Sequence, residues 1–380
     1  MSYDFDTVIN RHNTGSLKWD YFKDPDVISM WVADMDFKVA SPILEALHKE
    51  IDFGVLGYSQ PQEKLNELII ERISNNFNWE INKDWIVWLP GLVPALNAAC
   101  RGVGNDGHKV LTITPIYPPF LTAPRLSRRK REVISLKRNQ QKWELDFEEF
   151  EKQCADGVKL LLLCNPHNPV GKVYTKDELE NIFLICDRYD IVVCSDEIHC
   201  DLILNDELNH IPYASIHKNA EKNSITLMAP SKTFNIPGLN CAYAIIPDKE
   251  IRDEFNKSKE GIIPYATGLG YSACYAAYKE CHAWRQELLV YLNGNLSLLQ
   301  ETVNSLENVS MIPPEATYLA WVNISKLQIE NPMETFASYG LGISPGKWFQ
   351  DKDYIRINFG TSKSQMEKAM DRFRKAVNEI

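Results

Sequence analysis

The middle of the chain alternates short apolar runs with longer stretches in which apolar residues recur at helical spacing. Between two of these runs, Thr175 and Glu178 have the spacing of a helix capping box. Such alternation predicts an α/β fold in which a mainly parallel sheet is covered by helices. The apolar runs predict strands over residues 85–89, 109–114, 159–164, 191–195, 224–229 and 241–246.

The two ends of the chain do not follow this alternation. Residues 1–45 have no regular pattern, and a long polar helix is predicted over 282–307, before a short strand-rich C-terminal part. We therefore expect a large domain over residues 46–281. A smaller α+β domain would combine residues 1–45 with residues 282–380.

Composition narrows the range of functions. The chain has 380 residues, of which 44% are hydrophobic and 24% charged, as in folded globular proteins. Lys and Arg total 41 against 51 Asp and Glu, and the net charge of −10 predicts that the protein binds neither nucleic acid nor an anionic membrane. The basic cluster over residues 125–131 is interpreted as a solvated edge.

Location and redox state can also be predicted from the sequence. The N-terminus lacks the basic start and apolar stretch of a secretory signal, and no segment approaches the ~20 apolar residues of a membrane-spanning helix. The nine cysteines include no CxxC pair, so zinc is not indicated. We expect a cytoplasmic protein with reduced thiols.

Polar residues follow several of the predicted strands. Asp196 comes directly after the apolar run 191–194, Lys232 follows the strand predicted over 224–229, and the Asn- and Pro-rich loop 165–171 ends a third strand. Ligands of open α/β sheets bind just beyond the carboxyl ends of the strands. These loops therefore predict one common ligand site.

These segments resemble the fold-type I pyridoxal phosphate enzymes of the aminotransferase class I/II superfamily, in the same order over most of the chain. Three of them, residues 30–37 (MWVADMDF), 195–199 (SDEIH) and 229–235 (APSKTFN), resemble the cystathionine β-lyase branch, the PatB/MalY-type C–S lyases. The resemblance implies the fold of the pyridoxal phosphate-dependent transferases. It also implies pyridoxal 5′-phosphate as the cofactor, a homodimer, and a small cysteine-derived substrate.

The resemblance assigns four residues to the cofactor ring. Lys232 matches the lysine whose amine forms a Schiff base with the cofactor. Asp196 matches the carboxylate that keeps the ring nitrogen protonated, so that the ring can act as an electron sink. Tyr117 matches the aromatic residue stacked on the ring, and Asn168 the amide that hydrogen-bonds its phenolic oxygen.

The cofactor phosphate would lie at the turn that converts the strand predicted over 85–89 into a helix, where backbone N–H groups are free to bind an anion. These groups belong to Gly91, Leu92 and Val93, and Ser231 would add a hydroxyl. The chain departs from the aspartate aminotransferase pattern at two positions. Ala229 replaces a hydroxyl residue, and Asn240 replaces an arginine. Phosphate binding therefore depends on other groups.

One such group is Tyr58, which matches a tyrosine that reaches the phosphate from the neighbouring subunit. The resemblance also assigns His199 to the cofactor, because it stands where many aminotransferases carry a tyrosine near the phenolic oxygen of the cofactor, and this substitution resembles the C–S lyase branch. Arg356 lies in an alternating strand pattern and matches the arginine that grips the substrate α-carboxylate. Asp34 is expected near the same end of the substrate.

These matches predict a C–S β-lyase that cleaves L-cystathionine or another cysteine S-conjugate to a thiol, pyruvate and ammonia. Lys232 would remove the Cα proton before the sulfur group leaves Cβ. An aminotransferase that uses a 2-oxo acid acceptor is the alternative, because Lys232, Asp196, Asn168 and Arg356 would serve both reactions. From a different class, the chain could be an interaction protein in which catalysis is secondary or absent.

Overall fold

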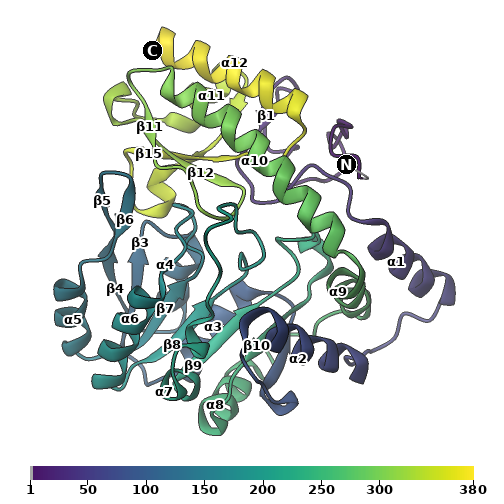
Figure 1. Cartoon of the computed structure of the whole chain (residues 1–380), viewed down its shortest axis with the longest axis vertical. Coiled ribbons are helices and arrows are strands. Elements are labelled where there is room, and N and C mark those ends of the chain that lie inside the picture. Colours follow the sequence, from purple (N-terminus) through teal and green to yellow (C-terminus); the bar gives the residue numbers. More distant parts are fainter. Residues whose placement is uncertain (1–2) are drawn as a thin grey trace.

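A seven-stranded sheet forms the centre of the computed structural model, which describes residues 3–380 (Figure 1). All neighbouring strands are parallel except β10, which is antiparallel to both of its neighbours. The spatial order is β2 (Ile86–Leu89), β10 (Ala242–Ile245), β9 (Ser224–Met228), β8 (Val192–Asp196), β7 (Val158–Cys164), β3 (Lys109–Thr114) and β4 (Lys130–Ser135). The six predicted strands and the mainly parallel sheet are confirmed.

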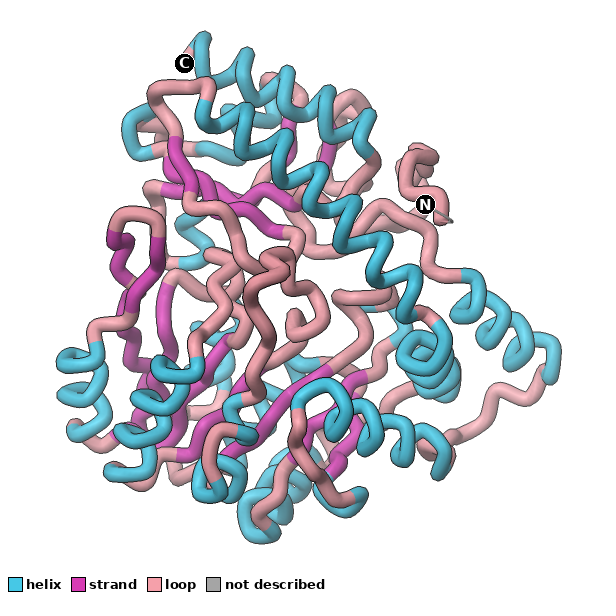
Figure 2. Tube along the Cα trace, in the orientation of Figure 1, coloured by secondary structure: helices cyan, strands magenta, loops and turns pink. Residues whose placement is uncertain are grey.

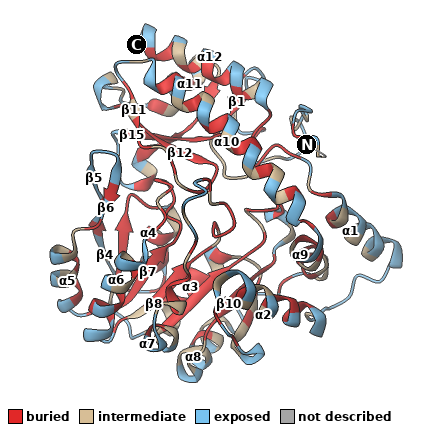
Figure 3. Ribbon diagram, in the orientation of Figure 1, coloured by how far each residue is buried: buried red, intermediate tan, exposed pale blue. Residues whose placement is uncertain are grey.

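Helices cover both faces of this sheet. On one face lie α3 (Leu92–Gly102), α4 (Pro118–Leu126) and α8 (Lys249–Lys259). On the other face α5 (Phe147–Ala155) and α6 (Lys176–Arg188) pack at one end, and α2 (Glu63–Phe77) and α9 (Gly268–Glu280) pack at the other. The inner strands such as β7 and β9 are therefore buried along almost their whole length (Figure 3), which explains why they read as unbroken apolar runs, whereas the edge strand β4 is mostly exposed.

A smaller sheet and its helices pack above the carboxyl end of the central sheet. Its antiparallel strands, in spatial order, are β11 (Ser310–Met311), β12 (Leu319–Asn323), β15 (Tyr354–Asn358) and β14 (Ser344–Pro345). The helices α10 (His282–Asn304), α11 (Pro332–Ser338) and α12 (Lys363–Glu379) belong to the same hydrophobic core. The long helix predicted over 282–307 is confirmed as α10.

Several N-terminal residues, among them Phe5, Trp19 and Ile28, pack in the same hydrophobic core as this smaller sheet. Residues 3–40, before α1 (Ser41–Phe53), are almost entirely loop (Figure 2), and the one short strand among them, β1 (Ile28–Ser29), pairs in parallel with β13 (Leu341–Gly342). The helix α1 crosses the predicted boundary at residue 45 and packs against α9 of the larger part. The division at residues 45 and 281 stays a prediction.

The remaining elements lie at the edges. The strands β5 (Lys137–Asn139) and β6 (Lys142–Glu144) form a hairpin, and α7 (Lys218–Lys222) precedes β9. Within residues 3–380, no helix has both the length and the apolar character needed to cross a membrane. In the same residues, no three His, Cys, Asp or Glu side chains gather as metal ligands would.

The basic cluster is only partly a solvated edge. Arg125, Arg128 and Lys130 are exposed, but the Arg129 side chain is buried. Its guanidinium donates to the carbonyls of Arg101 and Gly104 at 3.1 and 2.9 Å and pairs with an Asp106 carboxylate oxygen at 3.1 Å. The interpretation is therefore wrong for Arg129, which ties the end of α3 to the start of β4.

The capping box at the start of α6 is confirmed, and it yields a stability prediction. The Thr175 hydroxyl accepts from the Glu178 N–H at 3.2 Å, and the Glu178 carboxylate accepts from the Thr175 N–H at 2.9 Å. We expect Thr175→Ala to lower the free energy of unfolding by about 1 kcal/mol, measured as a lower urea midpoint. The control Asn181→Ala, on the exposed face of α6, should not lower the midpoint, because alanine favours the helix interior more than asparagine does. Equal midpoints for both variants would contradict the prediction.

Candidate active site

A cavity of about 580 Å³ lies beyond the carboxyl ends of β7 and β8, below the smaller sheet. The predicted site residues line it, with the exception of Tyr58 and Asp34. Those that the cavity brings together are Gly91, Leu92, Val93, Tyr117, Asn168, Asp196, His199, Ser231, Lys232 and Arg356. They come from loops that are far apart in the sequence and that the parallel strands bring to one edge of the sheet.

Lys232 lies in the turn after β9 and has no carboxylate partner among the described residues. Its amine donates instead to the backbone carbonyl oxygen of Ala33 at 2.7 Å. Burial lowers the pKa of Lys232 to about 8, and the nearby positive charge of Arg356 acts in the same direction. A substantial fraction of the amine is therefore neutral and nucleophilic at mildly alkaline pH.

Asp196 is the last residue of β8 and is 5% exposed. Its carboxylate accepts one hydrogen bond of 3.2 Å from the Ile198 N–H and, within the described part of the chain, makes no ion pair. Burial raises the pKa of Asp196 to about 7, although the Ile198 N–H opposes the shift. A buried carboxyl group of this kind would be stabilised as an anion by a cation bound in the cavity.

Arg356 lies in the middle of β15 and is 4% exposed. Within the described part of the chain, its guanidinium donates only to neutral groups, the Trp31 carbonyl at 2.8 Å and the Asn168 amide oxygen at 3.2 Å, and at 3.5 Å it also approaches the Ser344 hydroxyl. Its Nε has no partner among the described residues. Burial lowers the pKa of Arg356 to about 10. A carboxylate entering the cavity would supply the missing negative charge.

His199 and Tyr117 are uncharged at neutral pH. Burial lowers the pKa of His199 to about 3, and the positive charges of Lys232 and Arg356 add to this effect. The His199 Nδ1 has no partner in residues 3–380. Tyr117 precedes α4 in the cavity wall, and burial raises the pKa of its phenol. Both rings therefore offer polar atoms without adding charge.

The turn before α3 keeps its backbone N–H groups available. Gly91 is the N-cap residue, and no side chain of residues 3–380 caps this helix end. Ser231 lines the same cavity. Ala229 and Asn240, the two departures from the aspartate aminotransferase pattern, also line it, so both substitutions lie within the site.

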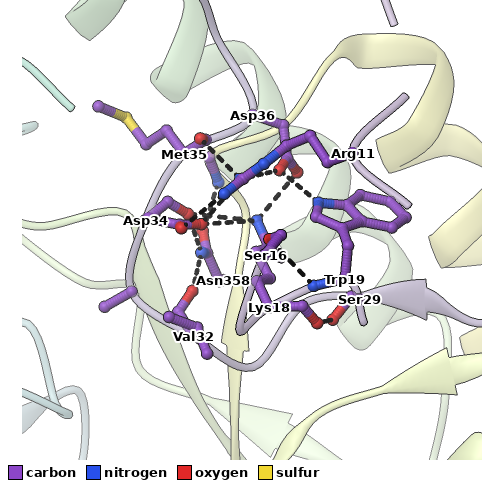
Figure 4. A network of polar contacts seen from close by, with 12 residues as sticks. Arg11, Ser16, Lys18, Trp19, Ser29, Val32, Asp34, Met35, Asp36 and Asn358 are labelled. Carbon is purple, nitrogen blue, oxygen red and sulfur yellow. Dashed lines mark hydrogen bonds and ion pairs between the residues drawn. The ribbon is translucent and has the colours of Figure 1, made fainter. Parts of the chain in front are cut away.

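The structure does not bring Tyr58 and Asp34 into the cavity. Tyr58 lies in the loop between α1 and α2, and its side chain is fully exposed, so a role in a neighbouring subunit stays a prediction. The Asp34 carboxylate instead accepts two hydrogen bonds from Arg11, at 2.9 and 3.0 Å (Figure 4). The neighbouring residue Ala33, and not Asp34, lines the cavity. This ion pair gives no support to a direct contact between Asp34 and the substrate.

Several lining residues were not predicted from the sequence. Ala33 and Trp31 belong to the 30–37 motif, but their contributions are backbone carbonyls, which leave no mark on the sequence. Trp348 and Phe349 lie in the turn Gly346–Phe349 after β14. The Arg356 guanidinium lies over the Phe349 ring, 4.7 Å from its centroid. No motif distinguishes these two aromatic residues from core residues.

The comparison with protein families decides the classification. The sequence model of the family "Aminotransferase class I and II" matches residues 25–373. The chain belongs to this family. Cystathionine beta-lyase PatB of Bacillus subtilis is 32% identical over 395 residues, which cover 98% of this chain and 100% of PatB.

Solved structures agree with membership of the aminotransferase class I and II family. The crystal structure of OvoB has a TM-score of 0.96 and 42% identity, and the match covers 100% of both chains. Cystalysin from Treponema denticola, whose structure contains pyridoxal 5′-phosphate, has a TM-score of 0.95 and 35% identity, again over 100% of both chains. The predicted fold type I of pyridoxal phosphate enzymes is confirmed.

Proposed function

We propose that this chain is a pyridoxal phosphate-dependent C–S lyase. It would cleave L-cystathionine or other cysteine S-conjugates by β-elimination to a thiol, pyruvate and ammonia. The observation that carries the proposal is a buried lysine amine that has no carboxylate partner among residues 3–380, in one cavity with a carboxyl group and a guanidinium that form no ion pair with these residues either. The similarity to PatB and cystalysin supports it.

The lining residues fit the cofactor. The carboxyl group of Asp196 has no cationic partner in the described residues and would pair with a protonated ring nitrogen. The Lys232 amine is available for covalent attachment, the uncapped start of α3 would bind the phosphate, and Tyr117 would flank the ring. When bound, pyridoxal 5′-phosphate withdraws electrons from the substrate Cα through its cationic ring.

Three residues that line the cavity would then have distinct roles in the reaction. Arg356 would bind the α-carboxylate of the amino acid in bidentate fashion and orient its Cα–H bond. Lys232 would accept the Cα proton, since its lowered pKa leaves part of the amine uncharged. Asp196 would remain ionised beside the ring nitrogen. The C–S bond then breaks, the sulfur leaves as a thiolate, and water releases pyruvate and ammonia.

The reaction can be tested without any 2-oxo acid. With holoenzyme and L-cystathionine alone, we expect pyruvate and free thiol to be released in equal amounts. Pyruvate is measured with a lactate dehydrogenase assay and the thiol with a thiol reagent. Heat-inactivated enzyme with free cofactor is the control for uncatalysed release. If neither product forms, but amino transfer occurs once a 2-oxo acid is added, the chain is an aminotransferase.

The proposed assembly is a homodimer in which Tyr58 reaches the phosphate of the partner's cofactor. The full exposure of Tyr58 and its absence from the described lining of the chain's own cavity support this arrangement. Analytical ultracentrifugation combined with activity measurements tests it, because a fully active monomer would contradict it. The described cysteines are all free and buried, which supports a reducing compartment such as the cytoplasm.

A further inference from the structure

One backbone carbonyl lies between two side chains of the site. The Ala33 carbonyl oxygen accepts a hydrogen bond of 2.7 Å from the Lys232 amine and one of 2.9 Å from the Tyr318 hydroxyl. Tyr318 is 1% exposed and directly precedes β12. Because a carbonyl oxygen has two lone pairs, these two donors use its full acceptor capacity.

The segment that carries this carbonyl, residues 31–36, is fixed on both sides of Ala33. The Asn358 amide donates to the carbonyls of Val32 and Asp34 at 2.5 and 2.7 Å. Further along, the Asp36 carboxylate accepts from Lys18 at 2.9 Å and from the Trp19 indole at 2.7 Å (Figure 4). The Ala33 carbonyl therefore has little freedom to move away from Lys232.

The charges beside the segment balance one another. Arg11 pairs with both Asp34 and Asp36, and the buried Lys18 pairs with Asp36 at 2.9 Å. Two cations thus face two carboxylates, and neither carboxylate forms an ion pair with Lys232. At longer range the negative charges of Asp34 and Asp196 raise the pKa of Lys232, but burial and the positive charge of Arg356 lower it by more. The group that holds the Lys232 amine is therefore a neutral carbonyl. A carboxylate in its place would stabilise the ammonium form and leave no lone pair to accept a proton.

We propose that the Ala33 carbonyl holds the free Lys232 amine in position for proton transfer, and that Tyr318 is a positioning residue acting through this carbonyl. By donating to the same oxygen, Tyr318 limits how strongly the carbonyl stabilises the protonated amine. One N–H of the neutral amine is held, and its lone pair stays available for the Cα proton. The inference rests on the proposed function only in taking Lys232 as the base.

The first test measures the Lys232 amine directly. Cofactor is removed from the full-length protein, and acylation of Lys232 by acetic anhydride is followed by peptide mass spectrometry across pH. In Tyr318→Phe the Ala33 carbonyl accepts a hydrogen bond from Lys232 alone. We therefore expect the apparent pKa of Lys232 to rise by roughly half a unit to one unit. The control Tyr243→Phe removes a buried hydroxyl outside the cavity and should titrate as the wild type does. A wild-type curve in Tyr318→Phe would overturn the inference.

The second test separates this inference from the proposed lyase reaction. The holoenzyme is incubated with L-alanine, which has no leaving group, and exchange of its Cα proton with D₂O is followed by NMR. On the acidic side of the pH–rate profile, Cα exchange by Tyr318→Phe should be up to about tenfold slower than exchange by the wild type. The two exchange rates should become equal at high pH. Wild-type exchange without thiol release from cystathionine would contradict only the proposed function. Identical exchange by both proteins at every pH would contradict only the inference.

A second variant covers the case in which Tyr318→Phe does not fold, as judged by circular dichroism. Asn358→Asp keeps the shape of the side chain and the acceptor for the Gly360 N–H, but it sets a carboxylate oxygen against the carbonyls of Val32 and Asp34. Displacement of residues 31–36 should slow Cα exchange about tenfold or more at all pH values, without the convergence expected for Tyr318→Phe. Wild-type exchange in this variant would overturn the inference.

Discussion

Replacement of Lys232 by alanine is expected to lower kcat/KM for L-cystathionine by at least about a thousandfold, because it removes both the covalent attachment point of the cofactor and the base. Lys232 is the one lysine among the described residues that line the cavity. His199 is the other nitrogen base there, but with a pKa near 3 it binds a proton too weakly to replace it. Pyruvate release measures the loss, and Lys257→Ala, on the exposed surface of α8, is the matched control.

Chemical rescue distinguishes the role of Lys232 as the base from its role as the attachment point of the cofactor. A small primary amine such as ethylamine, added to Lys232→Ala, should restore part of the proton transfer, with a rate that rises in proportion to the concentration of the free amine. Circular dichroism shows whether the variant keeps the wild-type fold. A folded variant that retains more than about a tenth of wild-type activity would contradict the assignment of Lys232 as base and attachment point.

The inner strands of the central sheet were predictable because they are covered on both faces and therefore read as unbroken apolar runs, whereas the polar and mostly exposed edge strand β4 was not among the predicted strands. The direction of β10 was not predictable in this way. Parallel neighbours require a crossover, usually a helix, whereas residues 229–241 between β9 and β10 hold only a turn and the short helix Pro237–Leu239. The turn that holds Lys232 lies in this connection. The same short segment therefore makes β10 antiparallel to β9 and places Lys232 in the site.

The charged residues of the site were predictable because Lys232, Asp196 and Arg356 carry side-chain chemistry that matches a family motif. The Ala33 carbonyl could not be predicted, because every residue has a carbonyl and only the fold decides which one faces the lysine. Tyr318 lies 285 residues from Ala33 in the sequence, so no local spacing relates them. The pairing of Asp34 with Arg11 is likewise a tertiary contact, 23 residues apart, that the motif alone does not reveal.

Asp196→Asn is expected to have opposite effects on activity and on the stability of the cofactor-free protein. Activity should fall by roughly a hundredfold to a thousandfold, because an amide cannot keep the ring nitrogen charged. The cofactor-free protein, in contrast, should become more stable than the wild type at pH 8, because the amide has no proton to lose. Asp187→Asn, on the exposed side of α6, is the control for both measurements.

The gain in stability of cofactor-free Asp196→Asn at pH 8 is expected from the pKa of Asp196, which burial raises from 3.8 to about 7. The folded protein binds this proton more tightly than the unfolded chain, so the stabilisation is present below pH 4 and is lost as the pH rises to 7 and above. The full loss would approach about 4 kcal/mol at pH 8. The melting temperature of the cofactor-free wild type should therefore fall between pH 5 and pH 8, and that of Asp196→Asn should fall less.

Bound cofactor should reverse the order of stability of the two proteins at pH 8, so that the wild type becomes more stable than Asp196→Asn. A protonated ring nitrogen beside Asp196 gives the carboxylate the cation that the described residues do not supply, so ionisation no longer costs stability. Pyridoxal 5′-phosphate should consequently raise the melting temperature of the wild type by more than that of Asp196→Asn. Equal increases in the two proteins would show that Asp196 does not face the ring nitrogen, and the orientation proposed for the cofactor would then be wrong.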